Sequence, residues 1–500
     1  MGRPLTRAYD WIAHHGRRTP GKLAAVDHAS GRRLTYGELD GRVARLAGHL
    51  RSLGVKAGDR VAVLAPNSVD VFEVQFACWR LGAILNPLNW RLAPPELEFI
   101  TGDSQPSVLV YDREQAELAA PLPGVKLERG GDESEYEKAV AGAEPLAQVA
   151  TPDLDDVLCL LYTAGTTGRP KGALITYGMT FWNAVNIGMA VDLTARSTCL
   201  VVLPTFHTGG LNLYANPTFH LGGTVVVMRA FDPGESLRLI SDPEAGVTHF
   251  FGVPANYLFM AQHPDFAAAD FSRLAATGLG GAPAPLPLLE TWARRGCPLM
   301  QGYGMTETSP SAIVIGGDQV IAKQGSCGLP VMHTEVRIVD QAGADVRPGE
   351  IGELWVRGPN VTPGYWRRPD ADAESFTDGW LHTGDAARQD EDGYYYIVDR
   401  WKDMFISGGE NVYPAEVENA IYALEGVGEA AVVGVPDERW GEVGRAFVVL
   451  KPGCTLSAEQ VLEHCRTQLA RFKVPKSVAF SDQPLPRNAA GKILKRELIR

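Results

Sequence analysis

Length, composition and charge already exclude several classes of protein. The chain has 500 residues, 45% of them hydrophobic, and its 47 Lys and Arg against 59 Asp and Glu give a formal net charge of −12. A chain of this length exceeds what one hydrophobic core supports, so we expect at least two domains. An acidic chain has no broad electrostatic reason to bind nucleic acid, and no apolar stretch approaches the about twenty residues of a membrane span.

Apolar runs typical of strands alternate with helical patterns through most of the chain. The first clear strand candidates are 60–64, 107–111 and 224–228. Between them, residues 41–53 carry Val43, Leu46 and Leu50 at helical spacing. This alternation predicts an α/β architecture with largely parallel sheets. The acidic stretch 130–137 is expected to be a solvated surface loop.

The pattern changes beyond about residue 330. Short alternating segments at 335–339 and 352–356, separated by turns, predict an antiparallel sheet or barrel. After Arg400, a helix is expected over 414–424 and strands over 430–435 and 446–450. The sequence therefore predicts a large N-terminal domain, 1–399, whose part from about 330 to 399 is barrel-like. A small, mobile α+β domain is expected over 400–500.

The chemically most informative segment is 162–172, Tyr-Thr-Ala-Gly-Thr-Thr-Gly-Arg-Pro-Lys-Gly, which follows the buried strand expected at 157–162. Glycines let backbone N–H groups approach phosphate oxygens, threonines add hydroxyl donors, and Lys171 adds a positive charge. Pro170 stands where a Walker A loop needs Gly, so an ordinary P-loop is excluded. A surface loop of small polar residues remains the alternative on this segment alone.

This segment resembles the phosphate loop of the adenylate-forming superfamily, which contains acyl-CoA synthetases, luciferases and peptide-synthetase adenylation domains. That loop has Ser or Thr where this chain has Ala164. Six further motifs occur in the order of the family, and together they span the chain from Leu34 to Lys492. They include 206–210, 278–283, 301–308, 380–385, 399–411 and 486–492.

The resemblance implies an ATP and AMP site. Tyr303 would stack on adenine, Asp385 and Arg400 would contact the ribose, and Glu307 would bind Mg²⁺. The complete implied nucleotide set is Thr163, Gly165, Thr166, Thr167, Gly168, Lys171, Gly281, Ala282, Pro283, Gly302, Tyr303, Gly304, Thr306, Asp385 and Arg400. Without the family, 303–307 is simply a turn before a helix with Thr306 as its cap.

The resemblance also implies catalytic and acyl-binding residues. Lys492 would stabilise charge on the α-phosphate, and the C-terminal domain would rotate about Lys402 between two half-reactions. His207 would lie beside the acyl carboxylate. The pantetheine of CoA would pass Gly408 and Gly409. The expected acyl pocket is lined by His207, Gly209, Gly210, Gly278 and Gly280, a roomy glycine-rich surface.

The implied reaction is that of an AMP-forming acid–CoA ligase using ATP, Mg²⁺ and CoA. Amino-acid-activating relatives carry Asp at the position of His207, and residues 203–227 contain no Lys or Arg. An unpaired buried charge is costly, so an acid with an uncharged tail is expected. A medium or long fatty acid is favoured by its frequency in the family, and an aryl or hydroxycinnamic acid is the alternative.

Three other functions remain open at this point. They are loading of a carrier protein, luciferase-like oxygenation and non-catalytic nucleotide sensing. Scattered cysteines without a Cys-x-x-Cys pair favour the cytoplasm, and a homodimer is the expected assembly.

Overall fold

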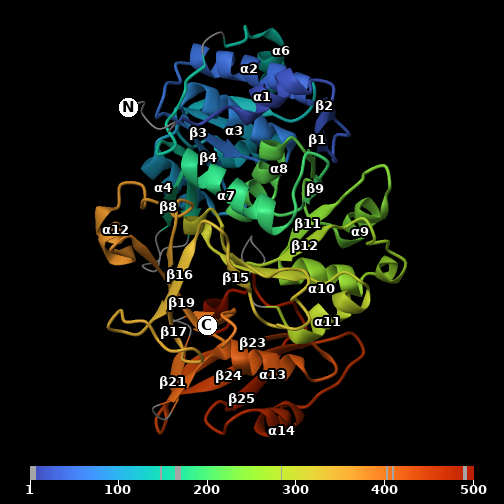
Figure 1. Ribbon diagram of the computed structural model, residues 1–500, viewed down its shortest axis with the longest axis vertical. Helices are drawn as coiled ribbons and strands as arrows, with labels where there is room; N and C mark the ends of the chain where they lie inside the picture. The colour runs from blue at the N-terminus through green and yellow to red at the C-terminus, as the bar shows by residue number, and fades with distance from the viewer. Residues whose placement is uncertain are drawn as a thin grey trace.

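The computed structural model describes residues 7–146, 149–163, 170–282, 284–400, 404–407, 410–487 and 493–499, with Arg400 and Asn411 described by their backbone alone. It is a mixed α/β structure with a large N-terminal domain and a small C-terminal domain, which lies at the foot of the view in Figure 1. Among the described residues, no helix is long and apolar enough to cross a membrane.

The first half of the chain builds a six-stranded sheet. Its order is β6-β5-β3-β4-β7-β8, and all pairings are parallel except that of β7 with β8. The strands are β3 (Arg60–Leu64), β4 (Ile84–Leu88), β5 (Val108–Asp112), β6 (Val125–Arg129), β7 (Val157–Thr163) and β8 (Lys171–Thr176). The strands predicted at 60–64, 107–111 and 157–162 are therefore confirmed within a residue.

A second, nine-stranded sheet has the order β15-β14-β13-β12-β11-β9-β10-β1-β2. Its strands are β1 (Leu23–Asp27), β2 (Arg33–Thr35), β9 (Thr198–Val201), β10 (Thr224–Val227), β11 (His249–Gly252), β12 (Ala276–Leu279), β13 (Met300–Gly304), β14 (Ser311–Val314) and β15 (Leu329–Pro330). One hydrophobic core joins this sheet to the first. Helix α3 (Val69–Leu81) has every residue buried, because it contributes to that shared core rather than to the surface.

Helices cover these sheets. They are α1 (Trp11–Arg18), α2 (Tyr36–Ser52), α4 (Pro94–Ser104), α5 (Ala116–Ala119), α6 (Glu135–Gly142), α7 (Tyr177–Ala190), α8 (Ala215–Leu221), α9 (Pro233–Ser241), α10 (Pro254–Gln262) and α11 (Leu286–Arg294). Helices α9, α10 and α11 share a separate core with the nine-stranded sheet and lie together at one side of the molecule (Figure 1).

The surface loop predicted at 130–137 is confirmed for 130–134, where 131–133 are exposed, and is wrong from Glu135 onwards. Helix α6 begins at Glu135, and Tyr136 is fully buried, where its hydroxyl donates to Glu73 at 2.7 Å. Glu137 is also not simply solvated, because Arg32 and Arg42 bind it at 2.7 Å. Paired arginines let acidic residues pack where isolated carboxylates would have to face water.

The change in sequence pattern near residue 330 corresponds to an antiparallel sheet. It contains β16 (Glu335–Val339), β17 (Gly352–Arg357), β18 (Phe376–Thr377), β19 (Trp380–Gln389) and β20 (Tyr395–Arg400). Helix α12 (Pro369–Ser375) precedes β18 and lies at the opposite side of Figure 1 from α10.

The C-terminal part has its own sheet and core. Strands β21 (Phe405–Ser407), β22 (Glu410–Val412), β23 (Val427–Asp437), β24 (Gly441–Leu450) and β25 (Ser477–Phe480) form the sheet, and α13 (Pro414–Tyr422) and α14 (Ala458–Gln468) pack on it. This α+β arrangement confirms the strands predicted at 430–435 and 446–450 and the helix predicted from Pro414. The predicted boundary between residues 399 and 400 itself stays a prediction.

Candidate active site

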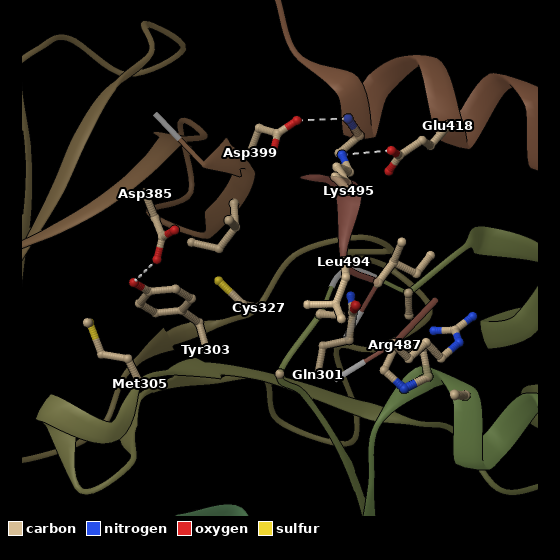
Figure 2. Close-up of a pocket in the computed structure, with 18 of the residues that line it drawn as sticks. Gln301, Tyr303, Met305, Cys327, Asp385, Asp399, Glu418, Arg487, Leu494 and Lys495 are labelled. Carbon is tan, nitrogen blue, oxygen red and sulfur yellow. Dashed lines mark hydrogen bonds and ion pairs between the residues drawn. The ribbon is translucent and has the colours of Figure 1, made fainter. Parts of the chain in front are cut away.

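One cavity of about 2320 Å³ lies where the large domain meets the C-terminal domain. Its walls come from both, and Figure 2 shows side chains of β13, β19, α13 and the chain end converging on it. The sequence-predicted residues that line it are Thr163, Lys171, His207, Gly281, Ala282, Gly302, Tyr303, Gly304, Thr306, Glu307 and Asp385. Segments separated by more than two hundred positions in the sequence thus share one space.

Several predicted residues lie outside the described part of the chain. They are Gly165, Thr166, Thr167, Gly168, Pro283, Lys402, Gly408, Gly409 and Lys492, together with the side chain of Arg400. The backbone of Arg400 pairs with Asp385 across β19 and β20. Arg487 and Ile493, which flank 488–492, pair with each other and both line the cavity.

The two arms of the phosphate loop form the antiparallel pair β7–β8. Thr163 pairs with Lys171 where the arms end, and both line the cavity. The preceding Tyr162 donates its hydroxyl to Asp103 at 2.8 Å, and Arg368 binds the other oxygen of Asp103 at 2.7 Å. A Cβ on Gly172 would lie 3.1 Å from the Tyr162 ring, a tight contact that glycine avoids. The β7 arm is therefore anchored through Tyr162.

Glu307 is buried in a short 3-10 turn, Thr306–Thr308, rather than in the first turn of a longer helix. Tyr365 donates its hydroxyl to Glu307 Oε1 at 2.8 Å. The Lys171 ammonium lies 5.4 Å from the centre of the Tyr365 ring. Burial, reinforced by the Glu307 carboxylate, raises the pKa of Tyr365, so its hydroxyl remains a donor at neutral pH.

The described residues contain no group of three or more His, Cys, Asp or Glu side chains that could hold a metal ion unaided. A single carboxylate such as Glu307 nevertheless suits Mg²⁺ bound to a nucleotide. That ion commonly takes one or two protein carboxylates, with phosphate oxygens and waters as its other ligands.

Tyr303 and Asp385 both line the cavity, and their side chains meet (Figure 2). The Tyr303 hydroxyl donates to Asp385 Oδ2 at 2.6 Å. The backbone N–H of Asp385 donates to the Thr383 hydroxyl at 3.1 Å, and Glu353 accepts from Gly384 at 3.0 Å. An aromatic ring and a carboxylate held side by side can bind a flat base and a sugar hydroxyl together.

His207 has a strongly perturbed ring. Burial, followed by the positive charge of Arg91, lowers the pKa of His207 to about 4. The imidazole is therefore neutral at physiological pH, and it can donate or accept a hydrogen bond without carrying charge. Arg91 was not predicted, because it lies outside residues 203–227, the segment around His207 that contains no Lys or Arg. It follows β4, more than a hundred positions earlier.

The four glycines expected to line a roomy acyl pocket are not among the described residues that line the cavity. A Cβ on Gly210 would lie 2.3 Å from the Pro204 carbonyl oxygen, and one on Gly278 would lie 2.4 Å from the Tyr214 hydroxyl. At Gly280 the nearest atom, the Gly302 carbonyl oxygen, would be 3.0 Å away. At Gly210, Gly278 and Gly280, backbone or aromatic atoms therefore lie close to where a Cβ would be. The acyl pocket expected at the four glycines stays a prediction.

The apolar wall of the cavity instead comes from two helices. Leu258 and Ala261 of α10, with Leu286 and Leu288 of α11, line it. Sequence reasoning missed these residues, because their apolar periodicity is also that of ordinary core helices.

The C-terminal domain closes the other side of the cavity. Lys495 binds Glu418 of α13 at 2.7 Å. Asp399, at the end of β20, accepts the backbone N–H of Ala415 at 2.9 Å (Figure 2). The first turn of α13 is thus joined to the last strand of the preceding sheet.

Two family models cover most of the chain. Residues 12–366 match the AMP-binding enzyme family, and residues 416–492 match the AMP-binding enzyme C-terminal domain. The chain belongs to the AMP-binding enzyme family. The predicted membership of the adenylate-forming superfamily is confirmed, and the two matches fall on the two domains seen in the fold.

Characterised relatives cover the chain almost completely. A feruloyl-CoA synthase of an Amycolatopsis species is 47% identical over 98% of both chains. An indoleacetate–CoA ligase of Aromatoleum aromaticum is 41% identical over 98% of this chain and 97% of its own. Both names specify a CoA ligase or synthase of an aromatic acid.

A solved relative gives a comparison of domain arrangement. ATP-bound MatB of Rhodopseudomonas palustris is 33% identical over 98% of both chains, with a TM-score of 0.89. The apo form of MatB covers the same share with a TM-score of 0.79. The structure of this chain is therefore more similar overall to the ATP-bound form than to the apo form.

Proposed function

We propose that the protein is an AMP-forming acid–CoA ligase that consumes ATP and CoA and uses Mg²⁺. The observation that carries this proposal is the single cavity shared by Thr163 and Lys171, Glu307, and the pair Tyr303–Asp385. A phosphate loop, a metal carboxylate and a base-and-sugar site in one space match the parts of MgATP. The relatives that act as CoA ligases support the choice of acceptor.

In the first half-reaction, the substrate carboxylate would attack the α-phosphorus of ATP and release pyrophosphate. Lys171 and the loop before it would bind the phosphates, and Tyr303 and Asp385 would hold the adenosine. When bound to Glu307, Mg²⁺ supplies positive charge that offsets the charge of the phosphates. Neutral His207 would orient the attacking carboxylate by a hydrogen bond without forming a competing ion pair.

Lys492 would stabilise the charge that develops on the α-phosphate. Support comes from Arg487 and Ile493, which flank it and face the cavity, and from the closer match to ATP-bound MatB. In the second half-reaction, rotation about Lys402 would withdraw Lys492 and bring Gly408 and Gly409 to the acyl-adenylate. The CoA thiol would then displace AMP.

We further propose an aromatic acid as substrate, in preference to the fatty acid expected on family frequency. The rings of Tyr214 and Phe251, 5.6 Å apart at 64°, fill the space beside Gly278. Neither ring is among the described residues that line the cavity, so this preference is carried by the relatives rather than by the packing. The relatives named for ferulate and indoleacetate agree with this preference.

The test is AMP release with MgATP and CoA across acetate, octanoate, palmitate, benzoate, ferulate, malonate and phenylalanine. We expect a clear maximum on an aromatic acid and dependence on CoA. The highest AMP release with palmitate would instead support the fatty-acid hypothesis. Adenylate formation that ignores CoA would point to carrier-protein loading or oxygenation, and no AMP from any acid would indicate nucleotide sensing.

Lys492→Ala separates the two half-reactions. We expect it to remove most adenylation, measured by ATP–pyrophosphate exchange, and to spare thioester formation from supplied acyl-AMP. Equal loss in both assays would contradict the role given to Lys492. A cytoplasmic homodimer and a domain boundary between residues 399 and 400 stay predictions, of which the first is testable by sedimentation velocity and cell fractionation.

A further inference from the structure

Tyr365 connects two groups that come from distant parts of the chain. Its hydroxyl donates to Glu307 Oε1 at 2.8 Å, and its ring lies 5.4 Å from the Lys171 ammonium. Tyr365 itself lines the cavity and belongs to none of the motifs found in the sequence. One side chain thus touches both the expected metal carboxylate and the expected phosphate lysine.

The backbone around Tyr365 is held firmly on the strand that follows the phosphate loop. Tyr365 forms an isolated antiparallel bridge with Ala173 of β8, and the neighbouring Trp366 donates to the Gly172 carbonyl at 2.8 Å. The N–H of Tyr365 donates to Asp372 at 2.8 Å. The ring therefore has little freedom to move independently of β8.

The same segment also contacts the turn that carries Glu307. The N–H of Thr362 donates to the Glu307 carbonyl at 2.7 Å, and the Thr362 hydroxyl donates to the Leu174 carbonyl of β8 at 2.7 Å. Residues 362–366 thus join the two halves of the phosphate and metal site through backbone as well as side-chain contacts.

We propose that Tyr365 is a positioning residue that holds the Glu307 carboxylate in the orientation needed for Mg²⁺ and holds Lys171 beside it. This inference rests on the proposed function, because Mg²⁺ and ATP are the groups to be positioned. The bond from the tyrosine hydroxyl to Oε1 fixes the orientation in which the Glu307 carboxylate would meet the ion. A carboxylate fixed before binding loses less entropy when the ion arrives, and such outer partners commonly contribute 10- to 100-fold in metal affinity.

The alternative is that Tyr365 has only a packing role in the wall of the cavity. The two readings differ in what Tyr365→Phe should do, since phenylalanine keeps the ring over Lys171 and removes only the bond to Glu307. A packing role predicts no change in metal affinity. A positioning role predicts weaker metal binding with little change in stability or in metal-free nucleotide binding.

The experiment measures Mn²⁺ affinity by electron paramagnetic resonance in the complex with an ATP analogue whose α,β-methylene bridge prevents adenylation. We expect Tyr365→Phe to weaken Mn²⁺ binding about tenfold. The same change in a Glu307→Gln background should have no further effect, because the hydroxyl acts through that carboxylate. Tyr365→Leu should in addition weaken metal-free ATP binding roughly two- to fivefold, since Lys171 loses its ring contact.

Tyr36→Phe is the matched control. Tyr36 is fully buried in α2, and its hydroxyl donates to the Gly223 carbonyl at 2.7 Å, away from the cavity. It should leave Mn²⁺ affinity unchanged. An unchanged Mn²⁺ affinity in Tyr365→Phe, or an equal loss of Mn²⁺ affinity in the Glu307→Gln background, would overturn this inference and leave the proposed function intact. A wild-type protein that bound neither Mn²⁺ nor the analogue would instead overturn the proposed function.

Discussion

Two adjacent glycines next to His207 should respond very differently to the same substitution. Gly209 and Gly210 begin the π-helical turn Gly209–Leu213. A Cβ on Gly210 would lie 2.3 Å from the Pro204 carbonyl oxygen and 2.4 Å from that of Leu203. A Cβ on Gly209 would meet only a Leu203 methyl, at 3.3 Å. The first obstacle is backbone, whereas the second is the end of a flexible side chain.

The required displacement follows from these distances. Ordinary van der Waals contact begins at 3.4 Å, so Gly210→Ala needs a movement of 3.4 − 2.3 = 1.1 Å in the backbone at Pro204. That same carbonyl accepts the backbone N–H of His207 at 3.1 Å, so His207 must move with it. Overpacking of this kind costs about 1–3 kcal/mol, and a 1 Å misplacement at a reacting centre can cost about 100-fold in rate.

The assay is ATP–pyrophosphate exchange with the preferred acid, together with thermal unfolding of each variant. We expect Gly210→Ala to lose about 100-fold in exchange and to unfold at lower temperature. Gly209→Ala needs a shift of about 0.1 Å and should change stability by no more than about 0.5 kcal/mol. If the two variants behaved alike, or altered only which acids are accepted, the close-packing explanation would be refuted in favour of an open glycine-lined pocket.

Three further outcomes follow from individual contacts. Burial and Arg91 lower the pKa of His207 to about 4, below its usual 6.5. As the pH falls, the unfolded chain therefore takes up this proton before the folded chain does. The free energy of unfolding should decrease as the pH falls from 6.5 towards 4. Arg91→Gln should raise the pKa of His207 in a ¹⁵N-detected histidine titration, and an unchanged value would exclude the electrostatic cause. Asp399→Asn removes the negative charge that accepts the backbone N–H of Ala415 at the start of α13. We expect it to slow adenylation about two- to fivefold and to spare thioester formation from acyl-AMP. Equal effects on both reactions would contradict a bond that is specific to this domain arrangement. Gly278→Ala, whose Cβ would lie 2.4 Å from the Tyr214 hydroxyl, should raise the KM for ferulate more than that for acetate, and equal changes would place the acyl group elsewhere.

Much of the fold was predictable because its elements have strong local signals. The run 60–64 becomes β3, and the helix expected from residue 414 begins there as α13, with proline in its first turn. The change from long apolar runs to short alternating ones near residue 330 marks the antiparallel sheet of β16 to β20. In each case the residues that decide the structure are neighbours in sequence.

The prediction of a solvated loop fails at 135–137 for the opposite reason. Acidic residues there predict a solvated loop only when no cations face them. The partners of Glu137 are Arg32 and Arg42, about a hundred positions away, and Tyr136 fills space beside Glu73. A local charge pattern cannot show whether such distant partners exist.

The same limit explains which parts of the site were missed. Tyr365 is separated from Glu307 by 58 positions, and Asp103 from Arg368 by 265. Each acts as a single side chain, with no spacing rule that a sequence motif could record. Contiguous segments such as 301–308 can be recognised in the sequence, because several consecutive residues must approach one ligand together.

The part of the site proposed to bind ATP is therefore easier to predict from the sequence than the part proposed to bind the acid. Phosphates, ribose and adenine are the same in every reaction that begins with ATP, so the contacts proposed for them come from short contiguous segments around Lys171, Tyr303 and Asp385. The acid differs between enzymes, and the apolar side of the cavity is assembled one residue at a time, from side chains such as Leu258 of α10 and Leu288 of α11. At Gly278, which looked like open space in the sequence, the rings of Tyr214 and Phe251 lie where a Cβ would be. The reaction can therefore be inferred from motifs, whereas the acid has to be inferred from packing.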